Sequence, residues 1–497
     1  MLGHKARTFT PRLVSLEDLV PPDNFYRQVE QRFNLHFVRD LVCHFYAPWG
    51  RPSIDPIVFF KLQLIAFFEG IRSERQLMET VNVNLAHRWY IGYDLTEAVP
   101  DHSSLSKIRE RYGLTTFQQF FERIVELCRQ AGLVWGEELY FDSTKVQANA
   151  DLDRLIPRVE WEAKQHLRQL FSAEAQTDES VTQVTSSPVT PLPLEPEVEP
   201  ALESDVPLTA SELVAKYNGT RLTGVHTPSY VRLTDQEVCP TDPDASPMRP
   251  SGGGNAVMGY SDHYVVDGGK QRIILNALVT PASIMDNTPL LDEVRWVCAR
   301  WQLHPKSATG DAKYGTIPNI VGLEQMGIRA YLPTSDFSQR TKFYPAERFH
   351  YEAEHDHYLC PQGQTLRLAI RRQSEQVFIY ACDATVCNAC PVKAECTDSH
   401  SGRHIFRSFF QDYLDRVEAY RKTEAYQKAL RKRSVWTEPL FGEAKQFHGL
   451  RRFRLRGLLK VNIEGVLTAA GQNLKRLLKC LKIRNSHNLL EGAQSVS

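Results

Sequence analysis

The chain has 497 residues, of which 42% are hydrophobic and 24% are charged, and its formal net charge is zero. This length allows two to four domains with a large core, and the composition is ordinary for a soluble protein. The N-terminus lacks the apolar segment of an export signal. The most apolar segment, residues 57–68, is interrupted by Lys61 and Gln63 and is too short to cross a bilayer. We therefore expect a cytoplasmic protein with no membrane partner.

Residues 1–133 have the apolar spacing of helices. Asp55 followed by Pro56 is typical of a helix N-terminus, and Ser73 with Gln76 fits the cap of the next helix. Short helices that carry basic residues suit a DNA-binding domain of the helix-turn-helix type. Small helical bundles have the same pattern, so the pattern alone leaves both interpretations open.

The segments that follow predict a linker and a catalytic core. Residues 134–171 contain the first strand, LYFDST. Residues 172–208 are rich in Pro, Ser, Thr and Glu and predict a disordered acidic linker. Residues 209–340 have the pattern of a hairpin, a helix, a strand, a helix and a strand. This is the element order of a ribonuclease H-like core, so we predict an α/β fold in which helices flank a mixed sheet.

The last third of the chain is basic. We divide it into a cysteine-rich insertion (341–405), a helical part of the core (406–485) and a tail (486–497). Residues 403–484 contain twenty Lys and Arg against seven Asp and Glu. This excess favours a polyanionic partner, although basic helices are often only solvated faces.

Two carboxylates follow predicted strands. Asp142 ends the apolar run of LYFDST, and Asp311 ends that of PKSATGDAKYG. Each could simply cap the next turn. If both lie at one sheet edge, they repel each other unless a cation neutralises them, and oxygen ligands suit Mg²⁺ or Mn²⁺. Glu438, on a predicted helix, is the candidate third ligand. Lys445 lies two turns later and faces the same way, whereas Glu443 is rotated away.

Five of the ten cysteines fall in one short segment. Cys387 and Cys390 have the spacing of a zinc knuckle, and Cys396 is within reach of the same ion. The fourth ligand is Cys360 or Cys382, and we favour Cys360 because its Cys-Pro turn matches the one at Cys390. We therefore predict a structural Zn²⁺ site. Buried free cysteines and an iron–sulfur cluster are the alternatives.

Together these segments resemble a DDE transposase of a bacterial insertion sequence. The N-terminal segments that carry the resemblance are RPSIDPIVFFKLQLIAFFEGIRSERQL and RWYIGYDLTEAVPDHSSLSKIRERYG. Those in the core are LYFDSTKVQANA, GYSDHYVVD, VTPASIMDN and GDAKYG, followed by EPLFGEAKQFHGLRRFRLRGLLKVNIEGVLTAAGQNLKRL. Their order is specific and spans most of the chain. It implies an all-α N-terminal domain, a ribonuclease H-like core and a β-rich, cysteine-containing insertion before the final Glu.

The resemblance also assigns roles to residues. It makes Asp142, Asp311 and Glu438 the metal-binding triad and Lys445 the basic residue seven positions after the Glu. Many relatives place a Tyr seven residues and an Arg four residues before that Glu. Here those positions are Arg431 and Ser434, which leaves the roles of Arg431 and Arg433 open.

The implied activity is metal-dependent cleavage of DNA strands at the ends of a mobile element, followed by transfer of the 3′-hydroxyl into target DNA. The implied partners are the terminal inverted repeats, the target DNA and a second copy of the chain in the DNA complex. Two alternatives are an inactive, transposase-derived DNA-binding protein and a hydrolytic nuclease of the same fold. The residues expected to contact DNA phosphates are Arg431, Arg433, Lys445, Arg451, Arg452, Arg454, Arg456 and Lys460.

Overall fold

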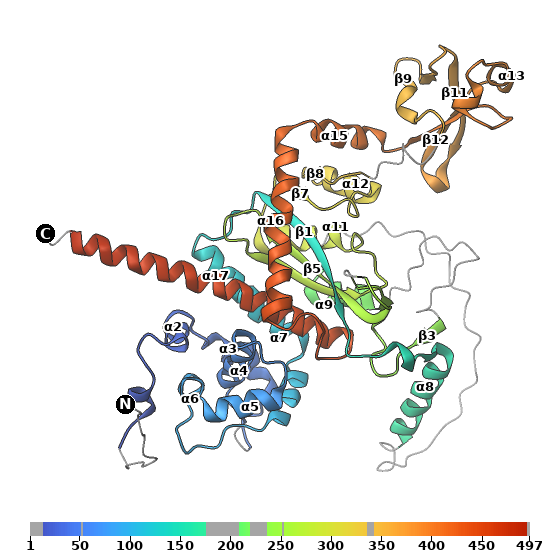
Figure 1. Ribbon diagram of the computed structural model, residues 1–497. Coiled ribbons are helices and arrows are strands. Elements are labelled where there is room, and N and C mark those ends of the chain that lie inside the picture. Colours follow the sequence, from blue (N-terminus) through green and yellow to red (C-terminus); the bar gives the residue numbers. More distant parts are fainter. Residues whose placement is uncertain are drawn as a thin grey trace, which may run out of the picture.

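The computed structural model describes residues 13–50, 53–174, 208–218, 236–250, 253–334 and 342–494 (Figure 1). The predicted acidic linker lies outside the described residues except at its two ends. The described chain forms a helical N-terminal region, a mixed sheet covered by helices, and a small β-rich unit. The mixed α/β class predicted from the sequence is confirmed. No helix among the described residues is long and apolar enough to span a membrane.

The N-terminal region is helical throughout its described part. Its helices are α1 (Leu16–Leu19), α2 (Phe25–Arg32), α3 (Phe37–Val42), α4 (Pro56–Phe68), α5 (Glu74–Val83), α6 (Leu85–Ile91) and α7 (His102–Gln130). The carboxylate of Asp55 accepts a hydrogen bond of 2.8 Å from the N–H of Ile57 and so caps α4 as predicted. α4 is buried on nearly all sides, and Phe60 stacks on Phe120 of α7 with ring centroids 4.5 Å apart. The apolar run of α4 is therefore a core helix.

The central sheet combines antiparallel and parallel pairing. Its strands are β1 (Glu138–Gln147), β4 (Ser246–Met248), β5 (Val257–Asp267), β6 (Ile274–Pro281), β7 (Ser307–Thr309) and β8 (Arg329–Tyr331). β5 pairs antiparallel with β1, β4 and β6, and β5 and β6 form the predicted hairpin. On its other side β1 pairs in parallel with β7, which pairs in parallel with β8. β1 is thus the centre of the sheet, where the antiparallel half meets the parallel half.

Helices cover both faces of this sheet. α16 (Glu424–Phe447) lies on one face, where Phe441 stacks on Tyr264 of β5 with ring centroids 4.4 Å apart. α11 (Leu290–Trp301) lies on the other face, where Asn276 of β6 donates a hydrogen bond to Glu293. Side chains alternate along a strand, so the face of Tyr264 and the face of Asn276 are opposite. α12 (Ile317–Gln325) connects β7 to β8, and α15 (Gln411–Arg421) precedes α16.

The long helix α17 (Leu458–Gln494) closes the sheet and joins it to the N-terminal region. Two buried asparagines replace a missing neighbour of β6: Asn462 bonds both backbone groups of Val279, and Asn473 bonds both of Ile274, at 2.8–2.9 Å. The backbone groups of Ile274 and Val279 on β6 are therefore not free to pair with a strand of another chain. α17 also packs along α7 (Figure 1).

The β-rich unit has its own sheet and its own core. The five antiparallel strands are β9 (His350–Glu352), β10 (His357–Leu359), β11 (Thr365–Arg372), β12 (Val377–Ala381) and β13 (His404–Ser408). Two short helices, α13 (Ala384–Asn388) and α14 (Lys393–Cys396), lie between β12 and β13. We call residues 342–408 the cysteine-rich unit. Figure 1 shows it at one end of the molecule, beyond α15. The remaining elements are β2 (Ile156–Pro157), α8 (Arg158–Glu174), α9 (Ala210–Asn218) and β3 (Glu237–Val238).

Candidate active site

Asp142 and Asp311 occupy equivalent positions on neighbouring parallel strands. The pairing of β1 with β7 ends at Tyr140 and Thr309. Asp142 and Asp311 each lie two residues beyond that pair, Asp142 within β1 and Asp311 just after the end of β7. Burial is the main cause that raises the pKa of Asp142, and the nearby charge of Asp311 adds to the rise. The two carboxylates are thus electrostatic neighbours.

The prediction that a strand ends at Asp142 is wrong. β1 continues to Gln147, and Asp142 pairs with Tyr264 of β5. The residues after Asp142 look like a loop because they are polar, but their partners on β5 are polar too. Lys145, for example, lies opposite Ser261 and donates a hydrogen bond of 2.7 Å to its hydroxyl. Only the pairing with β7 ends near Asp142, and this is what opens the sheet.

Asp142 is held by three donors. Its side chain is only 14% exposed. Oδ2 accepts a hydrogen bond of 2.9 Å from the Thr437 hydroxyl and lies 3.3 Å from Nη1 of Arg433, while Oδ1 accepts one of 2.9 Å from the N–H of Ser143. Burial still outweighs these contacts, and the pKa of Asp142 lies above its ordinary value. Two of the three donors come from α16, which therefore fixes the orientation of this carboxylate.

Arg433 also connects Asp142 to Glu438. Its Nη2 lies 3.7 Å from Oε1 of Glu438, whose side chain is 59% exposed. One guanidinium therefore stands between a carboxylate of β1 and a carboxylate of α16. The sequence left the role of Arg433 open, and the structure places this residue at the carboxylates.

α16 lacks one backbone hydrogen bond directly after Glu438. Pro439 lies inside the helix and has no N–H to donate to the carbonyl of Val435. Arg272, from the turn between β5 and β6, donates a hydrogen bond of 3.2 Å to that carbonyl instead. Glu438 therefore sits at a break in the hydrogen-bond ladder of α16.

The three carboxylates are not tightly clustered. Within the described part of the chain, three metal-ligating atoms come within 4.8 Å of one another only at Glu352, His355 and His357, in the cysteine-rich unit. Like charges that approach one another repel, and the Arg433 guanidinium offsets the charge of Asp142 and Glu438. Asp142 is thus near Asp311 and is linked to Glu438 through Arg433, while the three carboxylates do not form a single shell among the described residues.

Lys445 faces the same region, as its spacing from Glu438 predicted. It is half-buried, and burial lowers its pKa, while the charges of Asp262 and Asp142 oppose that effect. Asp262 was missed by sequence reasoning. It is fully buried on β5 opposite Thr144, and burial raises its pKa well above the ordinary range. The only signal for it was an Asp inside the predicted strand SDHYVVD.

Glu443, the rival of Glu438, belongs to a structural ion network. It lies 2.5 Å from Lys475 and 3.1 Å from Arg476, both on α17. Its pKa lies well below the ordinary value because His448 and these two cations outweigh the effect of burial. Glu443 therefore attaches α16 to α17.

Two of the predicted DNA-binding arginines bond to the backbone that follows β1. Nε of Arg452 donates to the carbonyl of Ala148 at 3.2 Å, and Nε of Arg456 donates to that of Asn149 at 2.9 Å. These contacts fix the turn between α16 and α17 against the end of β1. Both residues nevertheless keep exposed surface.

Two others connect to the N-terminal region. Arg454 lies 3.1 Å from Glu74 of α5, and Lys460 lies 2.6 Å from Glu110 of α7. Arg454 lines a groove of about 560 Å³ at this junction together with Arg72, Arg75, Arg109 and Arg452. Arg431 and Arg451 are exposed, and Arg431 borders a different cavity, beside Trp436. Part of the predicted basic cluster, Arg454 and Lys460, therefore pairs with acidic residues of the N-terminal region.

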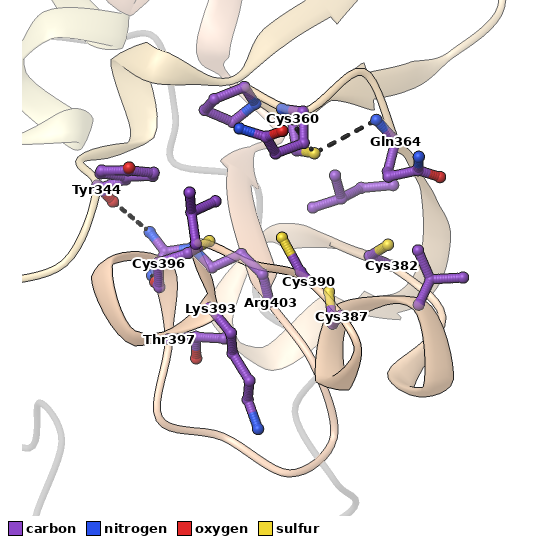
Figure 2. Close-up of a pocket in the computed structure, with 15 residues that line it drawn as sticks. Tyr344, Cys360, Gln364, Cys382, Cys387, Cys390, Lys393, Cys396, Thr397 and Arg403 are labelled. Atoms are coloured by element: carbon purple, nitrogen blue, oxygen red, sulfur yellow. Dashed lines mark hydrogen bonds between the residues drawn. The ribbon is translucent and has the colours of Figure 1, made fainter.

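The predicted cysteine ligands line one cavity in the cysteine-rich unit, separate from the candidate carboxylates. Cys360, Cys382, Cys387, Cys390 and Cys396 line one small cavity of the cysteine-rich unit (Figure 2). None of them forms a disulfide.

Comparison with known families identifies two segments. Residues 14–111 match a transposase domain (DUF772), and residues 359–478 match a transposase DDE domain. The second match includes Glu438, Lys445 and the five clustered cysteines, whereas Asp142 and Asp311 lie outside both matches. No curated protein and no solved structure matches the chain. The chain thus carries a transposase domain near its N-terminus and a transposase DDE domain toward its C-terminus, and the predicted resemblance to a DDE transposase is confirmed.

Proposed function

We propose that this transposase cleaves DNA strands at the ends of its mobile element and transfers them to target DNA, with Asp142, Asp311 and Glu438 as the metal-binding carboxylates. The observation that carries the proposal is the parallel register of β1 and β7, which sets Asp142 and Asp311 at equal offsets beyond their last pair. The strand pairing supports a ribonuclease H-like core, because an antiparallel hairpin is followed by two parallel strands around a central β1.

The donor set fits a hard divalent cation. Carboxylate oxygens are the ligands that Mg²⁺ and Mn²⁺ favour, and a cation among them would offset their mutual repulsion. Such an ion supplies Lewis acidity and charge neutralisation to phosphoryl transfer. Thr437 and the N–H of Ser143 orient the oxygens of Asp142, and Glu438 is exposed beside Arg433, which also contacts Asp142.

DNA would approach this edge along the basic junction. Arg451 and Lys445 offer positive charge near the carboxylates, and the groove beside Arg72, Arg75 and Arg454 continues it toward the N-terminal helices. Contacts of this kind are made to phosphates, so they position a strand end without reading its sequence. The N-terminal region then remains for recognition of the terminal repeats.

The test is a cleavage and joining assay with a labelled duplex that carries the inverted repeat flanking the coding sequence. Asp142→Asn, Asp311→Asn and Glu438→Gln should each abolish cleavage while DNA binding persists. Glu424→Gln, on the exposed first turn of the same helix, is the matched control and should cleave normally. Retained cleavage by any triad variant removes that residue from the proposal.

The same assay separates the two alternatives. A wild-type protein that binds the repeat but cuts nothing under any divalent metal would be an inactive, transposase-derived DNA-binding protein. A protein that cuts but does not join a pre-cut end to target DNA would be a hydrolytic nuclease. Products with element ends covalently attached to target DNA support transposition.

A further inference from the structure

The cysteine-rich unit has a small hydrophobic core for its size. Its buried core consists of six residues, Phe349, Tyr358, Leu366, Tyr380, Cys382 and Ile405. Most of the longest strand, β11, is exposed. Units of about this size need disulfides or a bound metal when the hydrophobic core is limited. No disulfide is present among its cysteines.

Five cysteines surround one enclosed space beside this core. They come from three segments: the turn after β10, the segment from the end of β12 to the turn after α13, and α14. The space has a volume of about 30 Å³, which is roughly the room that one water molecule or one ion needs. Figure 2 shows the sulfur atoms of Cys360, Cys387 and Cys390 directed into it. Among the described residues no three of these sulfurs lie within 4.8 Å of one another, so the side chains must close around the space to bind a soft, four-coordinate metal.

The turn after β10 is built around the sulfur of Cys360. The N–H groups of Gln362 and Gln364 lie 3.4 and 3.3 Å from Cys360 Sγ and donate to it. Gly363 makes the turn possible with φ of 75°, and its N–H bonds the carbonyl of Cys360 at 2.8 Å. Backbone donors directed at a sulfur stabilise its anionic form, which is the form that binds metal.

Cys382 lines the same space, and its thiol contacts that of Cys387, but more of its side chain is buried. It is one of the six core residues of the unit and is 7% exposed. Its backbone N–H donates to the carbonyl of Arg403 at 3.3 Å, so Cys382 directly extends the pairing of β12 with β13 by one residue. A buried cysteine in such a position behaves as a small apolar side chain. Of the two candidates for the fourth ligand, Cys360 therefore has the better environment.

The remaining three cysteines are fixed by local structure. The N–H of Cys390 bonds the carbonyl of Cys387 at 3.2 Å, which turns both side chains toward the space. Gly402, with φ of 86°, passes so close that a Cβ there would lie 3.4 Å from Cys387 Sγ. Arg403 lines the same space and donates to the carbonyl of Cys396 at 3.1 Å. Its positive charge would offset part of the negative charge of four thiolates.

We propose that Cys360, Cys387, Cys390 and Cys396 bind one Zn²⁺ ion that holds the cysteine-rich unit together, and that Cys382 is a core residue and no ligand. The inference does not depend on the catalytic proposal, because the ion has a structural role. Four sulfur ligands leave no open position, which is the arrangement of structural rather than catalytic zinc sites.

The first test is metal analysis of the purified full chain. Wild-type protein should contain about one zinc per chain, because structural zinc binds tightly near neutral pH. Cys360→Ser and Cys387→Ser should lose it, whereas the matched variant Cys382→Ala should keep it. Zinc that survives in Cys360→Ser but is lost in Cys382→Ala overturns the ligand assignment.

The second test uses only the wild-type chain and therefore does not rely on variants that fold. Protein refolded with Co²⁺ should show the intense visible bands of a tetrahedral ion and the near-ultraviolet charge transfer of four thiolates. A brown protein that contains iron would indicate a cluster and overturn the proposal. Zinc retained in every cysteine variant and lost in His357→Ala would place the metal at Glu352, His355 and His357, and would also overturn it.

Discussion

Arg433 and Asp142 form an ion pair between α16 and β1, with Nη1 3.3 Å from Oδ2, and the same guanidinium lies 3.7 Å from Glu438. The arginine therefore neutralises two carboxylates that we assign to metal binding. A divalent cation and Arg433 compete for the same oxygens, and the strength of this competition can be measured.

Arg433→Gln should make the fold more dependent on a divalent cation. Without the arginine, the buried carboxylate of Asp142 loses its main opposing charge, so the metal-free variant should melt at a lower temperature than the wild type. A ligand that binds only the folded state adds stability according to its affinity. Added Mg²⁺ or Mn²⁺ should therefore raise the melting temperature of the variant more than that of the wild type.

The matched control for this experiment is Arg431→Gln. Arg431 lies on the same helix but is exposed and borders a different cavity. Its substitution should leave the metal-induced shift in melting temperature unchanged. Equal metal-induced shifts in wild type and Arg433→Gln would show that Arg433 and the cation do not share these oxygens.

His263 should make the protein less stable in mild acid. Burial lowers the pKa of His263 from 6.5 to about 4, although the charge of Asp286 opposes the shift. The unfolded chain therefore takes up the proton first. Neutral His263 therefore contributes fully to the free energy of unfolding above pH 6.5, and this contribution is lost as the pH falls toward 4. A pKa shift of this size corresponds to roughly 3 kcal/mol.

Denaturant unfolding at pH 7.5 and pH 5 measures this contribution. Because carboxylates titrate in the same range, the informative quantity is the difference between wild type and His263→Gln. The wild type should lose more free energy of unfolding than the variant between the two pH values. Glutamine can keep a hydrogen bond to Thr280, the present partner of His263 at 2.9 Å. Identical pH dependence in both proteins would contradict the prediction.

Removal of Arg451 should weaken DNA binding, whereas removal of Arg454 should lower the stability of the fold. Arg451 is exposed, so Arg451→Gln should leave the melting temperature unchanged. If it contacts a phosphate, the slope of log affinity for DNA against log salt should become shallower by about 0.9. Arg454→Gln removes the 3.1 Å contact with Glu74 and should lower the melting temperature. The reverse result, with stability lost in Arg451→Gln alone, would mean that the two roles are exchanged.

Asn473→Leu should destabilise the fold through β6. Asn473 both donates to the carbonyl of Ile274 and accepts from its N–H, at 2.8 and 2.9 Å. Leucine fits the space but leaves two buried backbone groups unpaired, which costs about 2–4 kcal/mol. Urea unfolding should show this loss with an unchanged slope. Asn255→Leu, at an exposed position before β5, is the control and should shift the free energy of unfolding by less than about 0.5 kcal/mol.

The sequence determined the elements and the candidate residues. Apolar spacing predicted the helices of the N-terminal region and the hairpin of β5 and β6, because these patterns arise from local geometry. The spacing of Glu438 and Lys445 along one helix predicted that they share a face. Cys387 and Cys390 were predicted as ligands of one ion for the same reason, since residues three apart in a turn approach one another.

The tertiary structure decided which of these residues meet. Only the register of β1 and β7 aligns Asp142 with Asp311, and register depends on contacts between segments more than 150 residues apart. The same holds for Arg433, whose partner Asp142 lies on another element, and for Arg454, which bonds Glu74 rather than solvent. Likewise, the choice of Cys360 over Cys382 rests on backbone donors and burial. Local patterns carry no record of such partners, because pairings between distant segments are selected by the packing of the whole core.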